Sequence, residues 1–210
     1  MPPLPERLDS AELRVLGCLI EKQRTTPEQY PLTLNSLRLA CNQATNREPV
    51  LELGEGEVHT AVQRLSGYGY ARLATGPGSR TAKYRQLFGE TLDLLPPELA
   101  LLAVLMLRGP QTGAELKVRS ERLHHFASND EVEATLARLA ERELVQELPR
   151  QPGRREERWT QMLADEPQQE AAPLFAPRPV APPAVAPTAL EERLAQIEER
   201  LAELEARLLS

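Results

Sequence analysis

Residues 55–67 have the spacing of apolar and polar positions that is typical of a surface helix. Their apolar members recur at i, i+3, i+4 and i+7, which places them on one helix face and leaves polar members on the other. These apolar residues are Val58, Ala61, Val62 and Leu65. Gly67 and Gly69 follow, and glycine readily adopts the left-handed conformation that ends helices. The pattern therefore predicts a helix over about residues 55–67.

The residues after this helix predict a β-hairpin. Residues 70–73 alternate between apolar and polar side chains, as in a strand, and residues 76–78 (Gly-Pro-Gly) predict a turn. Residues 81–88 then predict a returning strand. A helix followed by a strand, a turn and a second strand is the second half of a winged helix.

The same pattern recurs later in the chain. Residues 131–148 match the helix and first strand that begin at residue 57, and residues 97–108 and 109–120 match residues 11–22 and 30–41. The changes in spacing between the matches fall in predicted loops, where insertions are tolerated. We therefore predict two tandem winged helix-turn-helix domains, over residues 1–89 and 90–163. The fold class is mainly α with small β-hairpin wings (α+β).

Further helices are expected from local signals. Asp9 and Glu12 form the pattern of a capping box, which predicts a helix from about residue 10 to Lys22. Thr33 is the predicted cap of a second helix. Residues 99–107 are apolar nearly all round, so the first helix of the second domain should be more buried than its counterpart.

The C-terminal part of the chain has a different composition. Proline and alanine dominate residues 164–188, which predicts a disordered linker. Residues 189–210 carry a heptad seam, which predicts a C-terminal coiled-coil helix. The seam consists of Leu190, Leu194, Ile197, Leu201, Leu204 and Leu208. Arginines at the g positions and glutamates at the e positions favour a parallel homodimer over an antiparallel one, although a lone charged helix has the same pattern.

The charge is unevenly distributed along the chain. The formal net charge of −6 disfavours a simple nucleic-acid binder, but residues 1–89 carry +2 and residues 90–163 carry −3. Only the first domain is therefore mildly basic. The predicted third helix of the second domain carries an acidic face that DNA phosphates would repel, so we expect that domain to serve in packing or protein contacts. This face comprises Asp130, Glu131, Glu133 and Glu141.

Candidate nucleic-acid-binding residues fall in three groups of the first domain. The loop between its second and third helices is rich in side chains that hydrogen-bond bases or phosphates, the third helix has a polar outer face, and the hairpin is basic. The candidates are Asn42, Gln43, Asn46, Arg47, His59, Thr60, Gln63, Arg64, Arg80, Lys83 and Arg85. A solvated loop, helix face and hairpin would show the same residues, and Glu55 and Glu57 would repel a phosphate near the start of the helix.

Several classes of function find no support in the sequence. We find no Gly-rich phosphate loop, no metal-ligand spacing and no nucleophile with a matching base, so we expect no catalytic residues, metal or cofactor, and no enzymatic activity. No apolar run is long enough to cross a membrane, and the first residues lack a signal peptide, which predicts a cytoplasmic protein. Cys18 and Cys41 lie in predicted helices and are expected to be buried free thiols, with a disulfide as the less favoured alternative.

Residues 14–50, 57–73 and 76–85 closely resemble the bacterial YceH family. The first of these segments, RVLGCLIEKQRTTPEQYPLTLNSLRLACNQATNREPV, is specific to it. The resemblance covers about residues 8–163 and implies a cytoplasmic protein with two winged helices. It brings no catalytic residues that could be assigned to this sequence, and the proline-rich linker and the heptads lie outside it.

Two functions are compatible with these observations. In the first, the protein is a transcription-regulator-like DNA-binding protein whose first domain contacts double-stranded DNA and whose coiled coil forms a homodimer. In the second, it is a non-enzymatic scaffold whose winged helices bind a protein partner, as in the acidic tandem winged-helix subunits of chromosome-condensing complexes, which it resembles in architecture. The basic first domain favours DNA by a small margin, whereas the acidic second domain favours a protein partner.

Overall fold

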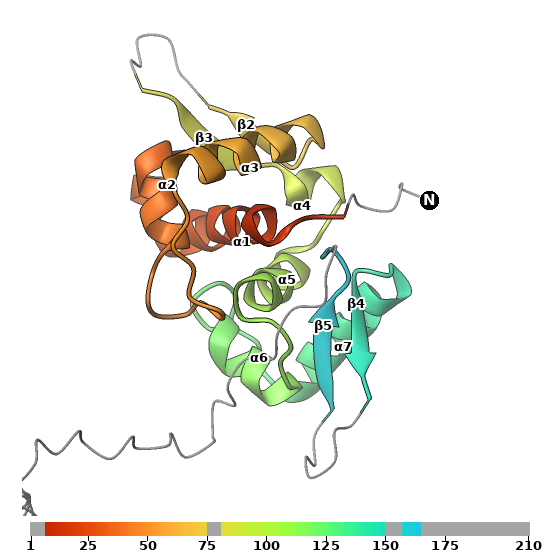
Figure 1. The fold of residues 1–210 in the computed structure, drawn as a ribbon. Coiled ribbons are helices and arrows are strands. Elements are labelled where there is room, and N and C mark those ends of the chain that lie inside the picture. Colours follow the sequence, from red (N-terminus) through yellow and green to blue (C-terminus); the bar gives the residue numbers. More distant parts are fainter. Residues whose placement is uncertain (1–6, 75–80, 150–156, 165–210) are drawn as a thin grey trace, which may run out of the picture. The chain divides into compact units, whose positions relative to one another are not determined.

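A computed structural model describes residues 7–74, 81–149 and 157–164 of the chain (Figure 1). The heptad residues, Arg80 and the predicted linker from residue 165 onward lie outside this part. The described part is a mixed α+β structure of helices and two small antiparallel sheets.

The first half of the described chain contains three long or medium helices and three short strands. The elements are α1 (Ser10–Thr25), the 3-10 turn η1 (Pro27–Gln29), β1 (Leu32–Thr33), α2 (Leu34–Cys41), α3 (Glu55–Gly67), β2 (Ala71–Leu73), β3 (Lys83–Gln86) and the short helix α4 (Phe88–Thr91). The predicted caps are present: Asp9 and Glu12 form a reciprocal capping box at α1, and the Thr33 hydroxyl accepts a hydrogen bond from the backbone N–H of Ser36.

The strand predicted over residues 81–88 is shorter than expected. It ends at Gln86, because Phe88 begins α4 and is fully buried. The ring of Phe88 packs edge-on against that of Tyr70, with centroids 5.0 Å apart. Core packing by an aromatic residue therefore ends the strand where the alternating pattern alone would continue it.

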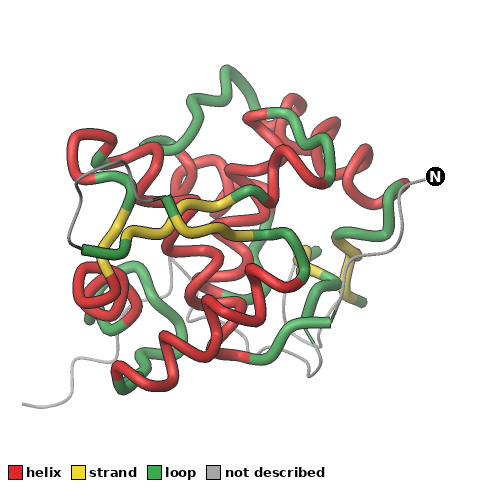
Figure 2. The backbone as a smooth tube through the Cα atoms, turned by 90° about the horizontal axis from the view of Figure 1, so that it is seen from above, coloured by secondary structure: helices red, strands yellow, loops and turns green. Residues whose placement is uncertain are grey.

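The second half repeats this order of elements. Its elements are α5 (Pro96–Arg108), α6 (Gly113–Ser120), α7 (Asn129–Glu141), β4 (Val145–Leu148) and β5 (Arg158–Gln161). In the first sheet, of order β1-β3-β2, Leu32 pairs with Tyr84. In the second half, Gln111 pairs with Trp159 through an isolated bridge. Because both pairs occupy matching positions of the sequence repeat, the repeat extends to the pairing of strands, and Figure 2 shows the two sets of strands in separate places.

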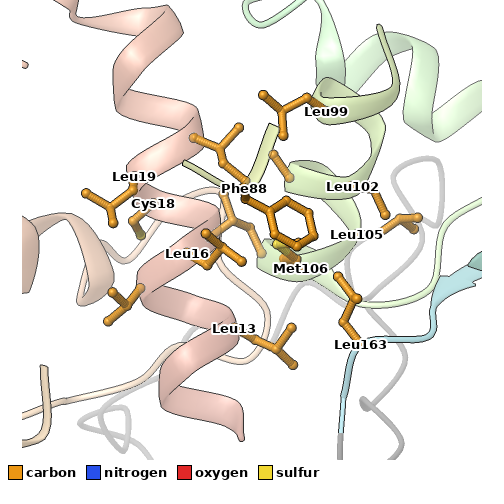
Figure 3. Packing of buried hydrophobic residues seen from close by; sticks show 14 of the residues in the cluster. Leu13, Leu16, Cys18, Leu19, Phe88, Leu99, Leu102, Leu105, Met106 and Leu163 are labelled. Carbon is orange, nitrogen blue, oxygen red and sulfur yellow. The ribbon is translucent and has the colours of Figure 1, made fainter. Parts of the chain in front are cut away.

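The two halves share one hydrophobic core, centred on α1 and α5. Figure 3 shows Leu16 of α1 and Leu102 of α5 on either side of Phe88. Every residue of α5 from Leu99 to Leu107 is buried, as its apolar sequence predicts. A Cβ atom on Gly17 of α1 would lie 2.9 Å from the side chain of Leu107, so glycine allows the close approach of the two helices.

Two backbone connections also join the halves. The Leu8 N–H donates to the Leu163 carbonyl at 2.7 Å, and the Glu48 N–H donates to the Leu107 carbonyl at 2.8 Å. Residues 7–164 therefore belong to one compact unit, despite the repeat in the sequence.

Candidate nucleic-acid interface

The outward face of α3 carries the most accessible of the predicted residues. Its apolar face is buried in the core, as the spacing predicts. Thr60 and Gln63 are exposed, whereas His59 is half-buried and lies with its Nε2 atom 3.4 Å from Nε2 of Gln63. These three side chains offer hydroxyl, amide and imidazole groups, which donate to and accept hydrogen bonds from base edges.

Arg64, on the same helix, has acidic neighbours at the start of α1. Its guanidinium donates to Oδ2 of Asp9 at 3.1 Å and lies 3.9 Å from Oε1 of Glu12. Because the Arg64 side chain is 56% exposed, it reaches solvent beside these partners. A phosphate would therefore compete with two carboxylates for this cation.

The β2–β3 hairpin places its cations on one face. Tyr84 and Gln86 of β3 are buried, so Lys83 and Arg85, which alternate with them, share the opposite face. Arg72 of β2 pairs with Arg85 across the sheet and is exposed, so it joins the same face. Arg85 also forms an ion pair with Glu90. The hairpin thus presents three cations, one of which has an acidic partner.

Arg72 was not among the residues predicted from the sequence. It lies in a stretch whose alternation predicts a strand, but the alternation does not show which residue of the returning strand stands opposite. The partner is set by the register of β2 and β3, and this register brings Arg72 and Arg85 together. Two like charges directly opposite each other disfavour pairing, so a basic hairpin of this kind suits an anionic partner.

One residue predicted as a contact in the loop between α2 and α3, Arg47, does not lie on the surface. Arg47 is buried, with 0% of its side chain exposed. It donates to both carboxylate oxygens of Glu21 at 3.1 and 2.6 Å, to the Ala40 carbonyl at 3.1 Å and to Oε1 of Gln43 at 3.0 Å. Its guanidinium therefore faces the interior of the protein and not a nucleic acid.

The pKa of Arg47 is raised from its ordinary value, although burial alone lowers it. The nearby Cys18 thiol and the Glu21 carboxylate outweigh burial, because negative charge on either stabilises the guanidinium. Arg47 is thus a charged group held inside the fold by a bidentate ion pair.

The other polar residues of the loop also have intramolecular partners. The Asn42 side chain donates to the Leu53 carbonyl and accepts from the Leu53 N–H, both at 2.9 Å. Asn46 has a left-handed backbone, and its side-chain oxygen accepts from Arg108 at the end of α5. Together with Arg47 and Gln43, these side chains attach the loop to α1 and α5.

The burial of Arg47 could not be predicted from the sequence, for a physical reason. Glu21 lies 26 residues before Arg47, so the ion pair depends on tertiary packing and leaves no local signal. A dense set of Asn, Gln and Arg side chains serves equally well to bind a ligand or to satisfy buried backbone groups. Of the predicted residues, the structure brings Thr60 and Gln63, with half-buried His59, to the α3 surface and Lys83 and Arg85 to the hairpin. It places Arg47 in the interior beside Glu21 of α1, and Asn46 beside Arg108 of α5.

The corresponding surface of the second half has the opposite charge. Asp130, Glu133 and Glu141 of α7 are exposed. Arg158 of β5 is buried and donates to Glu115 at 3.1 Å and to the Pro110 carbonyl at 2.7 Å. A phosphate backbone would be repelled from α7, so the candidate interface is confined to the first half.

Within the described residues, no group of three or more His, Cys, Asp or Glu side chains is arranged to hold a metal ion. None of the helices in that part has the length and apolar character needed to cross a membrane.

Most of the chain matches a known protein family. Residues 8–154 match the family model described as a protein of unknown function, DUF480. The chain belongs to the DUF480 family. Similar proteins of the family carry the name UPF0502 protein, and the resemblance to the YceH family stays a prediction.

Three relatives illustrate the similarity. The UPF0502 protein of Citrifermentans bemidjiense is 54% identical over 162 residues, which cover 76% of this chain and 75% of the relative. That of Geotalea uraniireducens is 49% identical over 193 residues, or 90% of this chain and 86% of the relative. That of Pseudomonas putida is 49% identical over 165 residues, or 79% and 76%. The α1–α7 core described above therefore belongs to a set of bacterial proteins whose names state no activity.

Proposed function

We propose that the described residues form two tandem winged helix-turn-helix domains and that the first of them binds double-stranded DNA. The element order supports the winged-helix interpretation: α1, β1, α2 and α3 precede the β2–β3 hairpin, and β1 pairs beside β3. In helix-turn-helix proteins, the second helix of the motif enters the major groove. Here that helix is α3, and the hairpin is the wing.

The observation that carries the proposal is that two surfaces adjoin each other, the outward face of α3 and the basic face of the β2–β3 hairpin. The outward residues Thr60 and Gln63 offer groups that read base edges, and the adjoining hairpin offers cations for phosphates. Because β2 follows α3 after a turn of three residues and packs against it, the two surfaces adjoin each other. A duplex seated on α3 would thus meet the hairpin on its backbone.

The acidic start of α3 limits how the duplex is placed. Glu55 and Glu57 are exposed, and the Glu57 carboxylate accepts a hydrogen bond from the Gly54 N–H at 2.7 Å. These charges disfavour phosphates at the N-terminus of α3. We therefore place the phosphates at the hairpin and the bases nearer to Gln63.

Paired substitutions test this placement. Replacing Arg72 and Lys83 by Ala should lower the affinity for a fluorescently labelled random duplex at low salt by at least about tenfold, since two phosphate contacts are removed. The matched control replaces Arg24 and Arg122, which are exposed cations elsewhere, and removes the same charge. If both variants lose equal affinity, net charge and not the hairpin governs binding.

A protein partner is the second candidate, and a different observation favours it. Leu39 of α2 and Val118 of α6 are 58% and 56% exposed, and they occupy matching positions of the repeat. Both side chains are available to pack against an apolar surface of a partner. Absence of salt-sensitive DNA binding by the unsubstituted protein, together with a protein partner that is still bound after the same substitutions, would favour this function.

We further propose that the chain forms a parallel dimer through residues 189–210. A dimer would present two first domains to one duplex, and linking two weak sites raises the overall affinity.

A further inference from the structure

Two arginines beside the proposed DNA surface are bound to carboxylates of their own chain. Arg64 of α3 donates to Oδ2 of Asp9 at 3.1 Å, and Arg85 of the hairpin forms an ion pair with Glu90 of α4. Both carboxylates reach solvent, since the side chains of Asp9 and Glu90 are 44% and 65% exposed. An anion from outside the protein can therefore compete with each carboxylate for its arginine.

The second half shows a different arrangement at the matching positions. Arg138, which matches Arg64 in the repeat, donates to Oε1 of Glu98 at 3.3 Å, and Glu98 matches Glu12. The Glu98 side chain is only 4% exposed, so the carboxylate of this pair is buried. In the first half, the Arg64 guanidinium lies 3.9 Å from buried Glu12 and donates instead to the exposed Asp9. The two halves thus differ in whether solvent reaches the carboxylate that binds the arginine.

Asp9 is specific to the first half and is held in place. Leu95 occupies the matching position of the second half. The Oδ1 atom of Asp9 accepts a hydrogen bond from the Glu12 N–H at 2.8 Å, and the preceding Leu8 N–H donates to the Leu163 carbonyl at 2.7 Å. A phosphate that approaches Arg64 must therefore either displace the guanidinium from Asp9 or bear the repulsion between like charges.

We propose that Asp9 and Glu90 are intramolecular competitors of DNA, which bind Arg64 and Arg85 until the phosphates of a duplex replace them. This inference rests on the proposed function, because it assigns the two arginines as further phosphate ligands of the same surface. Exposed ion pairs contribute little stability, so the exchange of a carboxylate for a phosphate costs little and keeps the cation paired. The two carboxylates thereby lower the affinity of the free protein for DNA.

Neutralising the carboxylates should strengthen DNA binding. Asp9→Asn keeps a capping side chain at the start of α1, and Glu90→Gln keeps the shape of the side chain, while each removes one negative charge. Fluorescence anisotropy of a labelled random duplex at low salt should show that each substitution raises the affinity by about two- to fivefold, the range expected for an exposed ion pair. An unchanged affinity in both variants would overturn the proposal.

A matched control separates these contacts from the effect of net charge. Asp130→Asn with Glu141→Gln removes the same charge as Asp9→Asn with Glu90→Gln, but from exposed positions of α7. The control should raise the affinity much less than the other double variant does. An equal gain in the two proteins would show that net charge alone governs the affinity and would overturn the proposal.

Removal of each arginine tests the individual pairs. In Arg64→Ala protein, Asp9→Asn should no longer raise the affinity, and in Arg85→Ala protein the same should hold for Glu90→Gln, because the competing contact is already absent. A gain that persists without the arginine would overturn the proposal, since the carboxylate would then repel the duplex directly. Circular dichroism and urea unfolding establish that each variant is folded before the titrations.

The same titrations distinguish failure of this inference from failure of the proposed function. If wild type shows salt-dependent DNA binding and the neutralised variants bind no more tightly, the surface binds DNA but Asp9 and Glu90 do not compete with it. If neither wild type nor the neutralised variants bind the duplex at low salt, the proposed function and this inference both fail.

Discussion

At the scale of single residues, the structure assigns similar side chains to different tasks. Gln63 and Gln43 both carry amides and were both predicted to contact DNA. In the structure, Gln63 is exposed on α3, whereas Gln43 accepts hydrogen bonds from Lys22 and Arg47. Arg72 is exposed, whereas Arg47 is buried. The residue type therefore indicates the available chemistry, and only packing decides between ligand binding and support of the fold.

The role of Arg47 predicts a loss of stability on substitution. Arg47→Met leaves Glu21 without its bidentate partner, and breaking a buried ion pair in this way costs about 3–5 kcal/mol of unfolding free energy. Urea unfolding followed by circular dichroism measures the loss, with Arg24→Met as the exposed control. Were Arg47 a phosphate ligand, the variant would lose DNA affinity and keep wild-type stability.

Tyr30 predicts how stability depends on alkaline pH. Its hydroxyl accepts a hydrogen bond from the Gln86 N–H at 2.6 Å, and burial raises its pKa to about 12 from 10.0. Because the folded state binds the proton more tightly, its stabilising contribution is complete below pH 10.0 and declines as the pH rises toward 12.

The comparison of wild type with Tyr30→Phe isolates this contribution, since the other titrating groups are common to both. Between pH 9 and pH 11, wild type should lose about 1 kcal/mol more unfolding free energy than the variant. Urea unfolding at several pH values measures the difference. Parallel pH profiles for the two proteins would contradict the burial of the Tyr30 hydroxyl.

At the scale of secondary-structure elements, local signals in the sequence account for most boundaries. Asp9 and Thr33 each directly precede a helix as predicted, because their side chains accept hydrogen bonds from free N–H groups of its first turn, and Thr112 does the same for α6. The prediction of β3 was wrong at its end, where the burial of Phe88 decides the conformation. Capping is a local interaction that the sequence reveals, whereas burial of one ring depends on distant residues.

The packing of one helix against another was the least predictable feature of the fold. The apolar character of residues 99–107 predicted that α5 is buried, but nothing in the sequence identified α1 as its partner. The glycine that permits their close approach, Gly17, lies in the middle of α1 and looks like an unfavourable helix residue.

This contact predicts a strong effect of a larger side chain. Gly17→Val should destabilise the protein by about 2–3 kcal/mol, because the new atoms overlap Leu107. Gly56→Val is the matched control, since a Cβ atom there has no neighbour within 4 Å. Thermal and urea unfolding of both variants measure the difference, and equal stability would show that α1 and α5 are not closely packed at Gly17.

At the scale of the whole molecule, the two halves differ in the charge that they present. The first half presents the cations Arg72, Lys83 and Arg85 beside α3, and the second half presents an acidic α7. The repeat was predictable from the sequence because both copies keep the same apolar positions. The candidate interface was only partly predictable, because Arg47 lies in the interior and Arg72 lies on the surface.

Self-association through the predicted coiled coil is a property of the whole molecule. Replacing Leu194 and Leu201 by Glu puts charges in the heptad seam, so the protein should sediment as a monomer, whereas wild type should sediment as a dimer. Replacing Ala195 and Ala202 by Glu adds the same charge at the predicted outward positions of the heptads and should leave the dimer intact. Equal sedimentation of all three proteins would contradict dimerisation through the heptad seam.

The most direct test of the central claim is the salt dependence of DNA binding. Fluorescence anisotropy of a labelled duplex, titrated with the full-length protein at several salt concentrations, gives the affinity at each concentration. The account predicts that the logarithm of the affinity falls linearly with the logarithm of the salt concentration, and that replacing Arg72 and Lys83 by Ala reduces the slope by about two, or one for each lost phosphate contact. Absence of binding at low salt, or binding that salt does not weaken, would contradict it.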